Sequence, residues 1–242
     1  MSQNLILYDF AIVLGATGGI GSEVARSVAT KAQKIYLIAR DLEKLDVLKK
    51  ELEESADASI VIKQLDFTSQ NIDIHVIEDS LGLKKSIGLI INCVGTYLSQ
   101  NFKDAAYQDI HQNFLINAMG PMALTASLIE YLAPGSLVIN LGSSLGYKPK
   151  AKRVLSAAVK HAVRGFTLGL AEELAQESIR VCLINPRSVA TPLLQKNSSS
   201  ESYQKAMPVE DLVRTIMMII DCDSRTLFSE INVGAAEGFL GQ

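Results

Sequence analysis

The chain has 242 residues and a formal net charge of −3, a length that suits one α/β domain and leaves no room for two. No block of lysine and arginine is dense enough to indicate contact with a nucleic-acid backbone. The apolar runs are far shorter than a membrane span and the N-terminus lacks a basic secretion signal, so we expect a cytoplasmic protein with no membrane partner.

Short apolar, β-rich runs alternate with longer helical patterns from one end of the chain to the other. That alternation predicts a parallel sheet whose strands are joined by helices. Several runs are apolar throughout, which is typical of strands covered by helices on both faces. We predict an α/β fold in which residues 1–242 form a single domain around a seven-stranded parallel sheet. The predicted strands are Phe10–Gly15, Lys34–Ala39, Ser59–Leu65, Ile87–Val94, Ser136–Leu141, Ile179–Ile184 and Thr226–Val233.

A glycine-rich turn directly follows the first predicted strand and leads into a predicted helix. Glycines let the backbone turn tightly and approach a pyrophosphate, while the N–H groups and positive dipole end of the helix face the anion. A tight strand-to-helix connection alone also recruits glycine. In this context, however, the turn indicates a doubly wound Rossmann-type domain that binds a dinucleotide, with Gly15, Gly19 and Gly21 as its key glycines. The whole turn reads Gly15-Ala16-Thr17-Gly18-Gly19-Ile20-Gly21.

The end of the second predicted strand bears on the choice of dinucleotide. A site specific for NAD(H) usually has an acidic residue here that bonds the ribose 2′-hydroxyl. Ala39 has no such group, and the guanidinium of Arg40 can bind a 2′-phosphate through paired donors. The alternative is that Arg40 is only a surface residue and that Asp41 is the N-cap of the next helix. We favour the first interpretation, which predicts NADP(H) as the cofactor.

The polar segment Asn197–Ser202 interrupts the alternation of strands and helices. It reads NSSSES and contains no residue that favours a strand. Such a segment is typical of a mobile loop or lid over a site, and equally of a solvated connector without a role.

The cysteines and histidines form no metal-binding pattern. No pair of them has the spacing of metal ligands, and no histidine is near a cysteine. Each cysteine is most simply a small buried side chain, so we expect no metal. The residues concerned are Cys93, Cys182, Cys222, His75, His111 and His161.

Further motifs follow in a fixed order. They are Asp66-Phe67 after the third strand, Asn92-Cys93-Val94-Gly95 at the end of the fourth, Asn117 in a helix, Ser143 after the fifth, and Asn185-Pro186 with Val189 and Thr191 after the sixth. In this order and at this spacing the chain resembles the short-chain dehydrogenase/reductase family from end to end. It departs from the family pattern at Arg187, where a glycine usually follows the proline.

The resemblance implies catalytic roles for Asn117 and Ser143, and the same doubly wound fold. It also implies a cofactor site in which Asp66 contacts the adenine ring and the segment after Pro186 holds the nicotinamide. The implied cofactor-binding residues are Gly15, Thr17, Gly18, Gly19, Ile20, Gly21, Ala39, Arg40, Asp66, Phe67, Asn92, Gly95, Lys160, Pro186, Val189 and Thr191.

The largest departure from the family lies in its catalytic pair, a tyrosine and a lysine four residues apart on one helix face. The matching residues are Ser156 and Lys160. The resemblance implies that Lys160 binds the nicotinamide ribose, but a serine hydroxyl is a much weaker acid than a phenol and its side chain is several ångströms shorter. Proton transfer from Ser156 would need a water relay. We expect the loss of a positioned acid to slow the reaction by about 10²–10⁴-fold while cofactor binding remains.

Two tyrosines lie near the predicted centre. Tyr147 follows Ser143 by four residues and is a candidate substitute proton donor, or else a pocket wall or a surface aromatic. Tyr97 can line the same pocket. With Leu145, Leu193 and Leu194 nearby, the pattern favours a small-molecule substrate of apolar or mixed character.

Two functions fit this sequence. The first is an NADP(H)-dependent oxidoreductase acting on a carbonyl or alcohol, with an atypical active site. The second is a catalytically silent NADP(H)-binding sensor or scaffold. Ser156 favours the second, whereas the retained Ser143 and Lys160 favour the first, which we prefer because bare nucleotide binding needs neither.

A symmetric homo-oligomer, either a homodimer or a homotetramer, is also expected. The helices predicted around 113–131 and 154–176 resemble those that the family pairs across a two-fold axis, and self-complementary pairing is the usual route to a dimer. Both carry apolar residues, namely Leu124, Leu128, Leu168 and Leu174.

Overall fold

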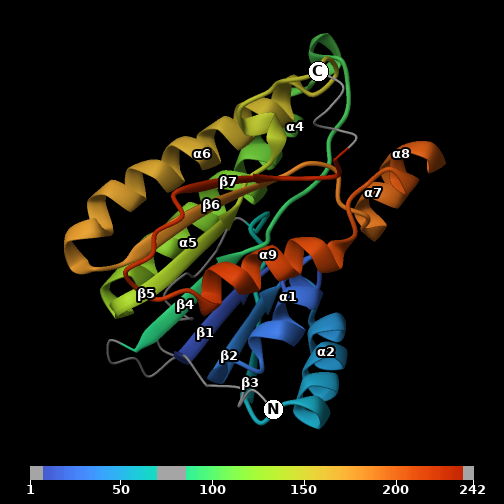
Figure 1. Ribbon diagram of the computed structural model, residues 1–242. Helices are drawn as coiled ribbons and strands as arrows, with labels where there is room; N and C mark the ends of the chain where they lie inside the picture. Colours follow the sequence, from blue (N-terminus) through green and yellow to red (C-terminus); the bar gives the residue numbers. More distant parts are fainter. Residues whose placement is uncertain (1–7, 70–85, 237–242) are drawn as a thin grey trace.

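All seven predicted strands are present in the computed structural model, which describes residues 8–69 and 86–236 (Figure 1). They form one parallel sheet in the order β3-β2-β1-β4-β5-β6-β7, so the predicted doubly wound α/β fold is confirmed. His75 lies outside the described residues. The strands are β1 (Tyr8–Leu14), β2 (Ala32–Ala39), β3 (Ser59–Gln64), β4 (Ile87–Asn92), β5 (Leu132–Leu141), β6 (Arg180–Pro186) and β7 (Glu230–Val233).

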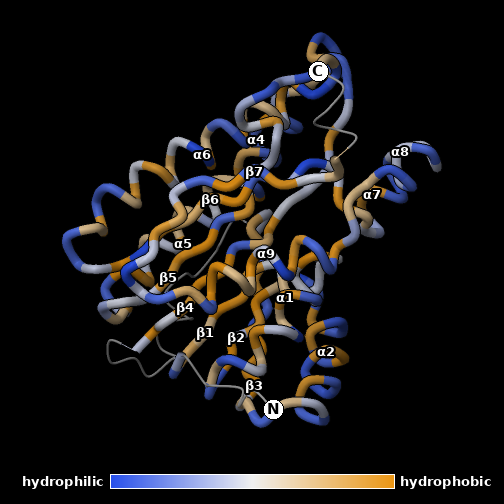
Figure 2. The backbone as a smooth tube through the Cα atoms, in the orientation of Figure 1, coloured by the Kyte–Doolittle hydropathy of each residue, from blue (hydrophilic) through white to orange (hydrophobic). Residues whose placement is uncertain are grey.

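The central strands are buried on both faces because their side chains alternate between two apolar clusters. In β1, Ala11 and Val13 belong to one cluster, whereas Ile12 and Leu14 belong to the other. Successive side chains of a strand point to opposite faces, so a strand that is apolar throughout requires a helical layer on each side. Figure 2 shows these orange strands between helices that are partly blue. The main helices are α1 (Gly21–Val28), α2 (Leu42–Ser55), α4 (Tyr107–Phe114), α5 (Gly120–Leu128), α6 (Val154–Leu174), α7 (Pro192–Asn197), α8 (Ser200–Gln204) and α9 (Val209–Asp221).

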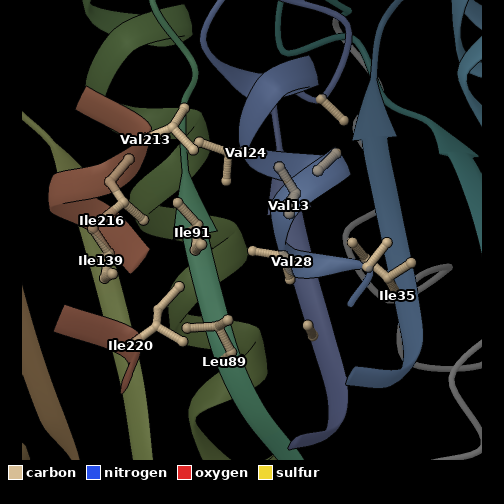
Figure 3. Close-up of a cluster of buried hydrophobic side chains, with 14 of the residues drawn as sticks. Val13, Val24, Val28, Ile35, Leu89, Ile91, Ile139, Val213, Ile216 and Ile220 are labelled. Carbon is tan, nitrogen blue, oxygen red and sulfur yellow. The ribbon is translucent and has the colours of Figure 1, made fainter. Parts of the chain in front are cut away.

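Helices α1, α2 and α9 cover one face of the sheet. Figure 3 shows Val24 and Val28 of α1 and Ile216 and Ile220 of α9 around Ile91 of β4. Each of these side chains is at most 1% exposed, and full burial of such a side chain is worth about 1.5–3 kcal/mol. This layer therefore fixes α1, and with it the glycine turn that precedes α1, against the end of β1.

Helices α5 and α6 cover the opposite face of the sheet. Most of the leucines that were expected at a subunit interface are buried here instead. Leu124, Leu128 and Leu174 are buried against the sheet, and only Leu168 is partly exposed. The helical period places these leucines on the inward stripe, so three of the four residues proposed for an interface belong to the core. None of the described helices has both the length and the hydropathy needed to cross a membrane.

Two predictions of local structure were wrong. The segment predicted as a loop or connector, 197–202, ends α7 and begins α8, because the Ser199 hydroxyl accepts a hydrogen bond from the Ser202 amide and caps α8. A run of serines thus starts a helix through capping. The last strand begins at Glu230 and not at Thr226, whose amide bonds to the Asp223 carbonyl in a turn.

The sheet has a topological switch point between β1 and β4. The chain leaves β1 toward β2 on one side and reaches β4 on the other. Loops that diverge in this way leave a crevice at the carboxyl ends of the strands, which is where ligands bind in open α/β sheets.

Candidate cofactor-binding and catalytic site

The glycine turn between β1 and α1 is too tightly packed for side chains at three positions. Gly15 has φ +74°, and a Cβ there would lie 3.0 Å from the Cys93 backbone. A Cβ on Gly21 would lie 2.1 Å from the carbonyl oxygen of Gly15, and one on Gly19 would lie 2.8 Å from Cδ of Pro192. These are the three glycines singled out in the sequence, and their close approaches leave the backbone of the turn free to meet a ligand.

A cleft of about 240 Å³ opens beside this turn at the switch point. It is formed by the carboxyl ends of β1, β2, β3 and β4 and the segments that follow them. Eight of the predicted cofactor-binding residues line it, namely Gly15, Thr17, Gly18, Ala39, Arg40, Asp66, Phe67 and Gly95. The sequence reasoning did not anticipate nine other lining residues: Leu14, Ile38, Asp41, Lys44, Leu65, Cys93, Val94, Thr96 and Ile116.

Two cations border the cleft at the end of β2. Arg40 is exposed, and Lys44 lies one helical turn further along the chain, with its Nζ 3.0 Å from Oδ2 of Asp41. Asp41 caps α2 by accepting a hydrogen bond of 3.1 Å from the Lys44 amide, and this bond holds the pKa of Asp41 below its ordinary value. Asp41 therefore caps α2 while Arg40 and Lys44 still border the cleft, so the N-cap role of Asp41 does not exclude a basic cleft wall. Lys44 could have been found by asking which residue of the next helical turn faces back toward Arg40.

Asp66 and Phe67 shape the wall formed by the segment after β3. Oδ1 of Asp66 accepts hydrogen bonds from the amide and the hydroxyl of Thr68, at 2.8 Å and 2.7 Å. The backbone bond from Thr68 lowers the pKa of Asp66, so this carboxylate is ionised at neutral pH. The ring of Phe67 packs on Gly120, where a Cβ would lie 2.3 Å from it, and therefore anchors this wall to α5.

An asparagine in an irregular helical turn holds the segment after β4. Asn117 lies in a π-helical turn, η2 (Leu115–Met119), which separates α4 from α5. Its Oδ1 accepts a 2.7 Å hydrogen bond from the Thr96 amide, and its Nδ2 donates to the Thr96 hydroxyl and the Asn113 carbonyl. Asn92 is buried and accepts from the Val94 amide. Both asparagines thus support the backbone at Gly95 from behind, and the π-turn is a common feature of functional sites.

Ser143 is held by a polar network behind β5. Its amide donates a 3.1 Å hydrogen bond to Oδ1 of Asn185, which is fully buried at the end of β6. Nδ2 of Asn185 donates a 2.7 Å bond to Glu230 of β7, and Glu230 accepts two 2.8 Å bonds from Arg164 of α6. Gly142 makes this possible, since a Cβ there would lie 2.1 Å from Asn185 Oδ1.

The Arg164–Glu230 pair has the bidentate geometry of a strong charge-assisted interaction. Arg164 holds the pKa of Glu230 below its ordinary value, so the carboxylate is charged and can accept all three bonds. No local pattern in the sequence indicates this pair, because its members are 66 residues apart.

Lys160 also reaches the end of β5. Its Nζ donates a 3.0 Å hydrogen bond to the carbonyl of Leu141, two residues before Ser143. Burial lowers the pKa of Lys160 to about 8, because desolvation penalises the charged form. Burial also raises the pKa of the neighbouring Cys93 thiol to about 12, so this thiol is neutral at physiological pH. Lys160 and Ser143 therefore lie at the same strand end.

Ser156 is turned toward the loop after β4. Its hydroxyl donates a 3.0 Å hydrogen bond to the Leu98 carbonyl, and Arg153, the N-cap of α6, donates to the same carbonyl at 3.1 Å. The Arg153 guanidinium stacks on the ring of Tyr97, with its Cζ 3.7 Å from the ring centroid, and bonds to the phenol oxygen. Tyr147 is 36% exposed. The phenol that contacts the start of α6 is therefore Tyr97 and not Tyr147.

The segment after β6 closes the glycine turn from the other side. Pro186 pairs with Val233 in the sheet, Val189 bridges to Met207, and Thr191 caps α7 and lies 3.1 Å from where a Gly19 Cβ would be. The departure at Arg187 is accommodated because the facing residue is Gly234. A Cβ on Gly234 would lie 2.7 Å from the Cβ of Arg187.

These features define a dinucleotide-binding oxidoreductase type of site: a glycine turn at the switch point, a cleft, and polar groups converging at one strand end. The chain belongs to the short-chain dehydrogenase family, whose model matches residues 9–202. That range includes the glycine turn, Ser143 and Lys160. Among the described residues there is no cluster of histidine, cysteine and acidic side chains suited to a metal ion.

Relatives and solved structures resemble the chain along most of its length. An uncharacterized oxidoreductase of Staphylococcus saprophyticus is 26% identical over 225 residues, covering 92% of this chain and 95% of that protein. The very-long-chain 3-oxoacyl-CoA reductase of Bos taurus is 29% identical over 226 residues, covering 91% and 71%. A short chain dehydrogenase of Burkholderia cenocepacia, solved in complex with NADP, has a TM-score of 0.82 at 19% identity, covering 96% and 98%. The last similarity shows a shared fold.

Breaking the network behind Ser143 is expected to slow turnover modestly without abolishing folding. In Glu230→Gln, one carboxylate oxygen becomes an NH2 group, so one of the three hydrogen bonds is lost together with the negative charge that holds Arg164. The orientation of Asn185, and through it the acceptor of the Ser143 amide, is therefore held less firmly. A lost hydrogen bond to a charged group is worth about 1.5–3 kcal/mol, of which we expect a part, roughly tenfold in kcat, to reach the reaction. Hydrogen exchange of the Ser143 amide should accelerate in the same variant. Arg26→Gln, which breaks the remote Arg26–Glu51 pair, is the matched control, and equal effects of the two variants would contradict the role of the network.

Proposed function

We propose that this protein is an NADP(H)-dependent oxidoreductase that interconverts a carbonyl and an alcohol, with a serine at the position of the usual tyrosine. The observation that carries the proposal is the meeting of Ser143 and Lys160 at the end of β5. Ser143 is oriented through Asn185, and Lys160 through the Leu141 carbonyl. A silent NADP(H)-binding protein would need neither arrangement.

The residues of the cleft fit NADP(H). Gly15, Gly19 and Gly21 have no side chains that would keep a pyrophosphate away, so the backbone of the glycine turn is accessible at the start of α1. Arg40 and Lys44 supply two positive charges at the end of β2, where a 2′-phosphate would lie. The Burkholderia cenocepacia relative in fold was solved with NADP, which supports the same choice here.

The proposed division of labour follows from the chemistry of each group. When bound, the cofactor supplies or accepts a hydride. The Ser143 hydroxyl, which now accepts a 3.2 Å bond from the Leu145 amide, can donate to a substrate carbonyl oxygen and hold it. Lys160 is positioned for the nicotinamide ribose, and its positive charge stabilises developing negative charge on oxygen. Asn117 acts by positioning the segment at Thr96 and Gly95.

The proton that the substrate oxygen takes up during reduction must come from a group other than the residue at position 156. The Ser156 hydroxyl is engaged with Leu98, so we propose that water or Tyr97 supplies the proton, with Tyr147 a less favourable donor because its side chain is exposed. The test measures NADPH oxidation with a set of carbonyl substrates and, separately, NADPH binding by titration. The set includes a 3-oxoacyl thioester, the kind of substrate named for the bovine relative. Binding without turnover of any of them would leave the silent binder as the better description.

NADPH is expected to bind about 10–100-fold more tightly than NADH. Each of the two cations contributes a charge-assisted contact to the 2′-phosphate, worth about 1–1.5 kcal/mol at a partly exposed site. Arg40→Ala and Lys44→Ala should each reduce the NADPH-to-NADH ratio about tenfold or less, and the double variant should bring it close to 1. Calorimetric titration at fixed ionic strength measures the ratio. Lys50→Ala, on the same helix but outside the cleft, should leave the ratio unchanged, and an equal loss there would contradict this assignment.

We also propose a homodimer or homotetramer. Leu124, Leu128 and Leu174 lie in the core and cannot form an interface, but α4, η2 and α6 still present the exposed apolar side chains of Tyr107, Met119 and Val154. Light scattering at micromolar concentration is expected to give at least twice the chain mass of 26.2 kDa. A mass of a single chain would contradict the proposal.

A further inference from the structure

We infer that the substrate carries a phosphate-bearing, multiply charged tail, bound by a basic rim beside the proposed catalytic groups. The basic rim consists of Lys148, Lys150, Lys152 and Arg153. The inference rests on the proposed function for the location of the reacting carbonyl, and it extends the expectation of an apolar or mixed substrate to one with an anionic end.

The charge of the chain is strongly uneven around this segment. Residues 131–171 contain six lysines and arginines and no aspartate or glutamate, although the whole chain carries a net charge of −3. Three of the six have defined partners within the fold, since Arg164 pairs with Glu230, Lys160 bonds to the Leu141 carbonyl, and Arg153 bonds to the Leu98 carbonyl. The other three are lysines, and together with Arg153 they form the basic rim, which falls within six consecutive residues.

The structure holds the basic rim next to the proposed catalytic groups. The basic rim begins five residues after Ser143 and ends at Arg153, the N-cap of α6, whose first turn carries Ser156. The Lys148 amide donates a 2.8 Å bond to the Ser144 carbonyl, and the Gln100 amide donates a 3.1 Å bond to the Lys152 carbonyl. The rim is therefore joined to the turn after Ser143 on one side and to the loop after β4 on the other. In Figure 1 it lies before the yellow start of α6.

The charges of the basic rim are not neutralised within the described part of the chain. Some lysines elsewhere on the surface have a carboxylate beside them, as in Lys31–Asp221 and Lys205–Glu201. Lys103 and Lys196 have none within residues 8–69 and 86–236, but each is isolated in the sequence, whereas the lysines of the basic rim are clustered. No carboxylate of the described residues lies within 4.0 Å of Lys148, Lys150 or Lys152, and all three lysines are exposed. Arg153 is half-buried and is fixed in place by Leu98 and Tyr97.

A cluster of positive charges beside a site raises the local concentration of anions and steers them to that site. Four cations over six residues match a compact phosphate cluster better than an extended nucleic-acid backbone, which needs a longer basic stripe. A substrate with a carbonyl at one end and phosphates at the other would place its carbonyl near Ser143 while its charged end meets the basic rim. Lysine suits this task because its ammonium adapts to phosphates without fixed geometry.

The experiment compares two probes that share one reacting group. Acetoacetyl-CoA carries phosphates, and acetoacetyl-N-acetylcysteamine is its neutral counterpart. Binding of each probe to the NADP⁺-saturated protein is measured by calorimetry, where no reduction can occur, and turnover with NADPH is measured separately. We expect acetoacetyl-CoA to bind about tenfold more tightly at low ionic strength, with the difference shrinking as salt is raised.

The variants assign the preference to the basic rim. K148Q/K150Q should weaken acetoacetyl-CoA binding about fivefold, from two partly screened charge contacts, and leave the neutral probe unchanged. K49Q/K50Q removes the same charge from α2 and should change neither probe. Equal affinity for the two probes, a preference that K148Q/K150Q leaves intact, or the same loss in K49Q/K50Q would overturn the inference.

The two proposals fail in different ways. Turnover of both probes without a charge preference would overturn the basic rim and keep the oxidoreductase. Binding of acetoacetyl-CoA that depends on Lys148 and Lys150, with no turnover of either probe, would support the rim and count against catalysis of this reaction.

Discussion

Ser156→Tyr is expected to raise the rate of carbonyl reduction about 100-fold, the typical contribution of a positioned acid. A phenol at this position would lie on the same helix face as Lys160, four residues away, whose positive charge favours the phenolate that remains after the proton has left. In the wild-type protein the Ser156 hydroxyl instead donates to the Leu98 carbonyl. The measurement is steady-state NADPH oxidation with the same carbonyl substrate for both proteins.

The structure names the obstacle that this variant must overcome. Ser156 borders a cavity of only about 10 Å³, shared with Leu98, Gln100 and Arg153, so a tyrosine side chain cannot occupy the serine's direction. It must turn toward Ser143 or displace the loop after β4. Thermal unfolding and NADPH affinity of the variant are therefore measured first. A folded, NADPH-binding variant with no gain in rate would show that the site does not bind a carbonyl. In that case Tyr97→Phe would not lower the rate of carbonyl reduction either.

Tyr97→Phe discriminates between the proposed sources of the proton. If the phenol held by Arg153 supplies it, this variant loses most of the wild-type rate, whereas Tyr147→Phe changes little. If water supplies it, both variants keep the wild-type rate. In either case Ser156→Tyr is still expected to raise the rate of carbonyl reduction.

Lys160→Met is expected to make the protein more stable at pH 7 while weakening NADPH binding at least tenfold. Burial lowers the pKa of Lys160 to about 8 from the 10.5 of a free lysine. At pH 7 the lysine is charged in both the folded and the unfolded chain, so the folded state bears the full cost of burying an ammonium. That cost is up to about 3 kcal/mol, less whatever the bond to Leu141 returns. Methionine has a similar length and removes the charge.

The pH dependence gives this prediction its sharpest test. Between about pH 8 and 10.5 the unfolded chain holds a proton on Lys160 that the folded chain has lost, so wild-type stability rises with pH in this window. The stability difference between Lys160→Met and the wild type should therefore shrink from pH 7 to pH 10. Denaturant unfolding at both pH values measures it, and Lys160→Arg, which keeps the charge, serves as the control. A variant that is less stable than the wild type at pH 7 would contradict the assigned cost of burial.

The sequence by itself determined the architecture and the location of the cofactor cleft. Uniformly apolar runs such as that of β1 can only be buried between two helical layers. Gly15 and Gly21 are required by close backbone contacts, and Gly19 by the side chains of Thr191 and Pro192. Arg40 was found because the end of β2 is a local feature. Ser156 was recognised because its distance to Lys160 is set within one helix.

The tertiary structure decided what depends on residues far apart in the chain. Asn185, Glu230 and Arg164 reach Ser143 only because β5, β6 and β7 are neighbours in the sheet and α6 packs over them. Likewise, Arg153 meets Tyr97 and Leu98 only where two loops converge at the carboxyl edge. The sequence showed that two predicted helices carry Leu124, Leu128 and Leu174, but not whether these leucines face the sheet or a second subunit. Packing settled it, because only the folded sheet offers an apolar face for these leucines to bury.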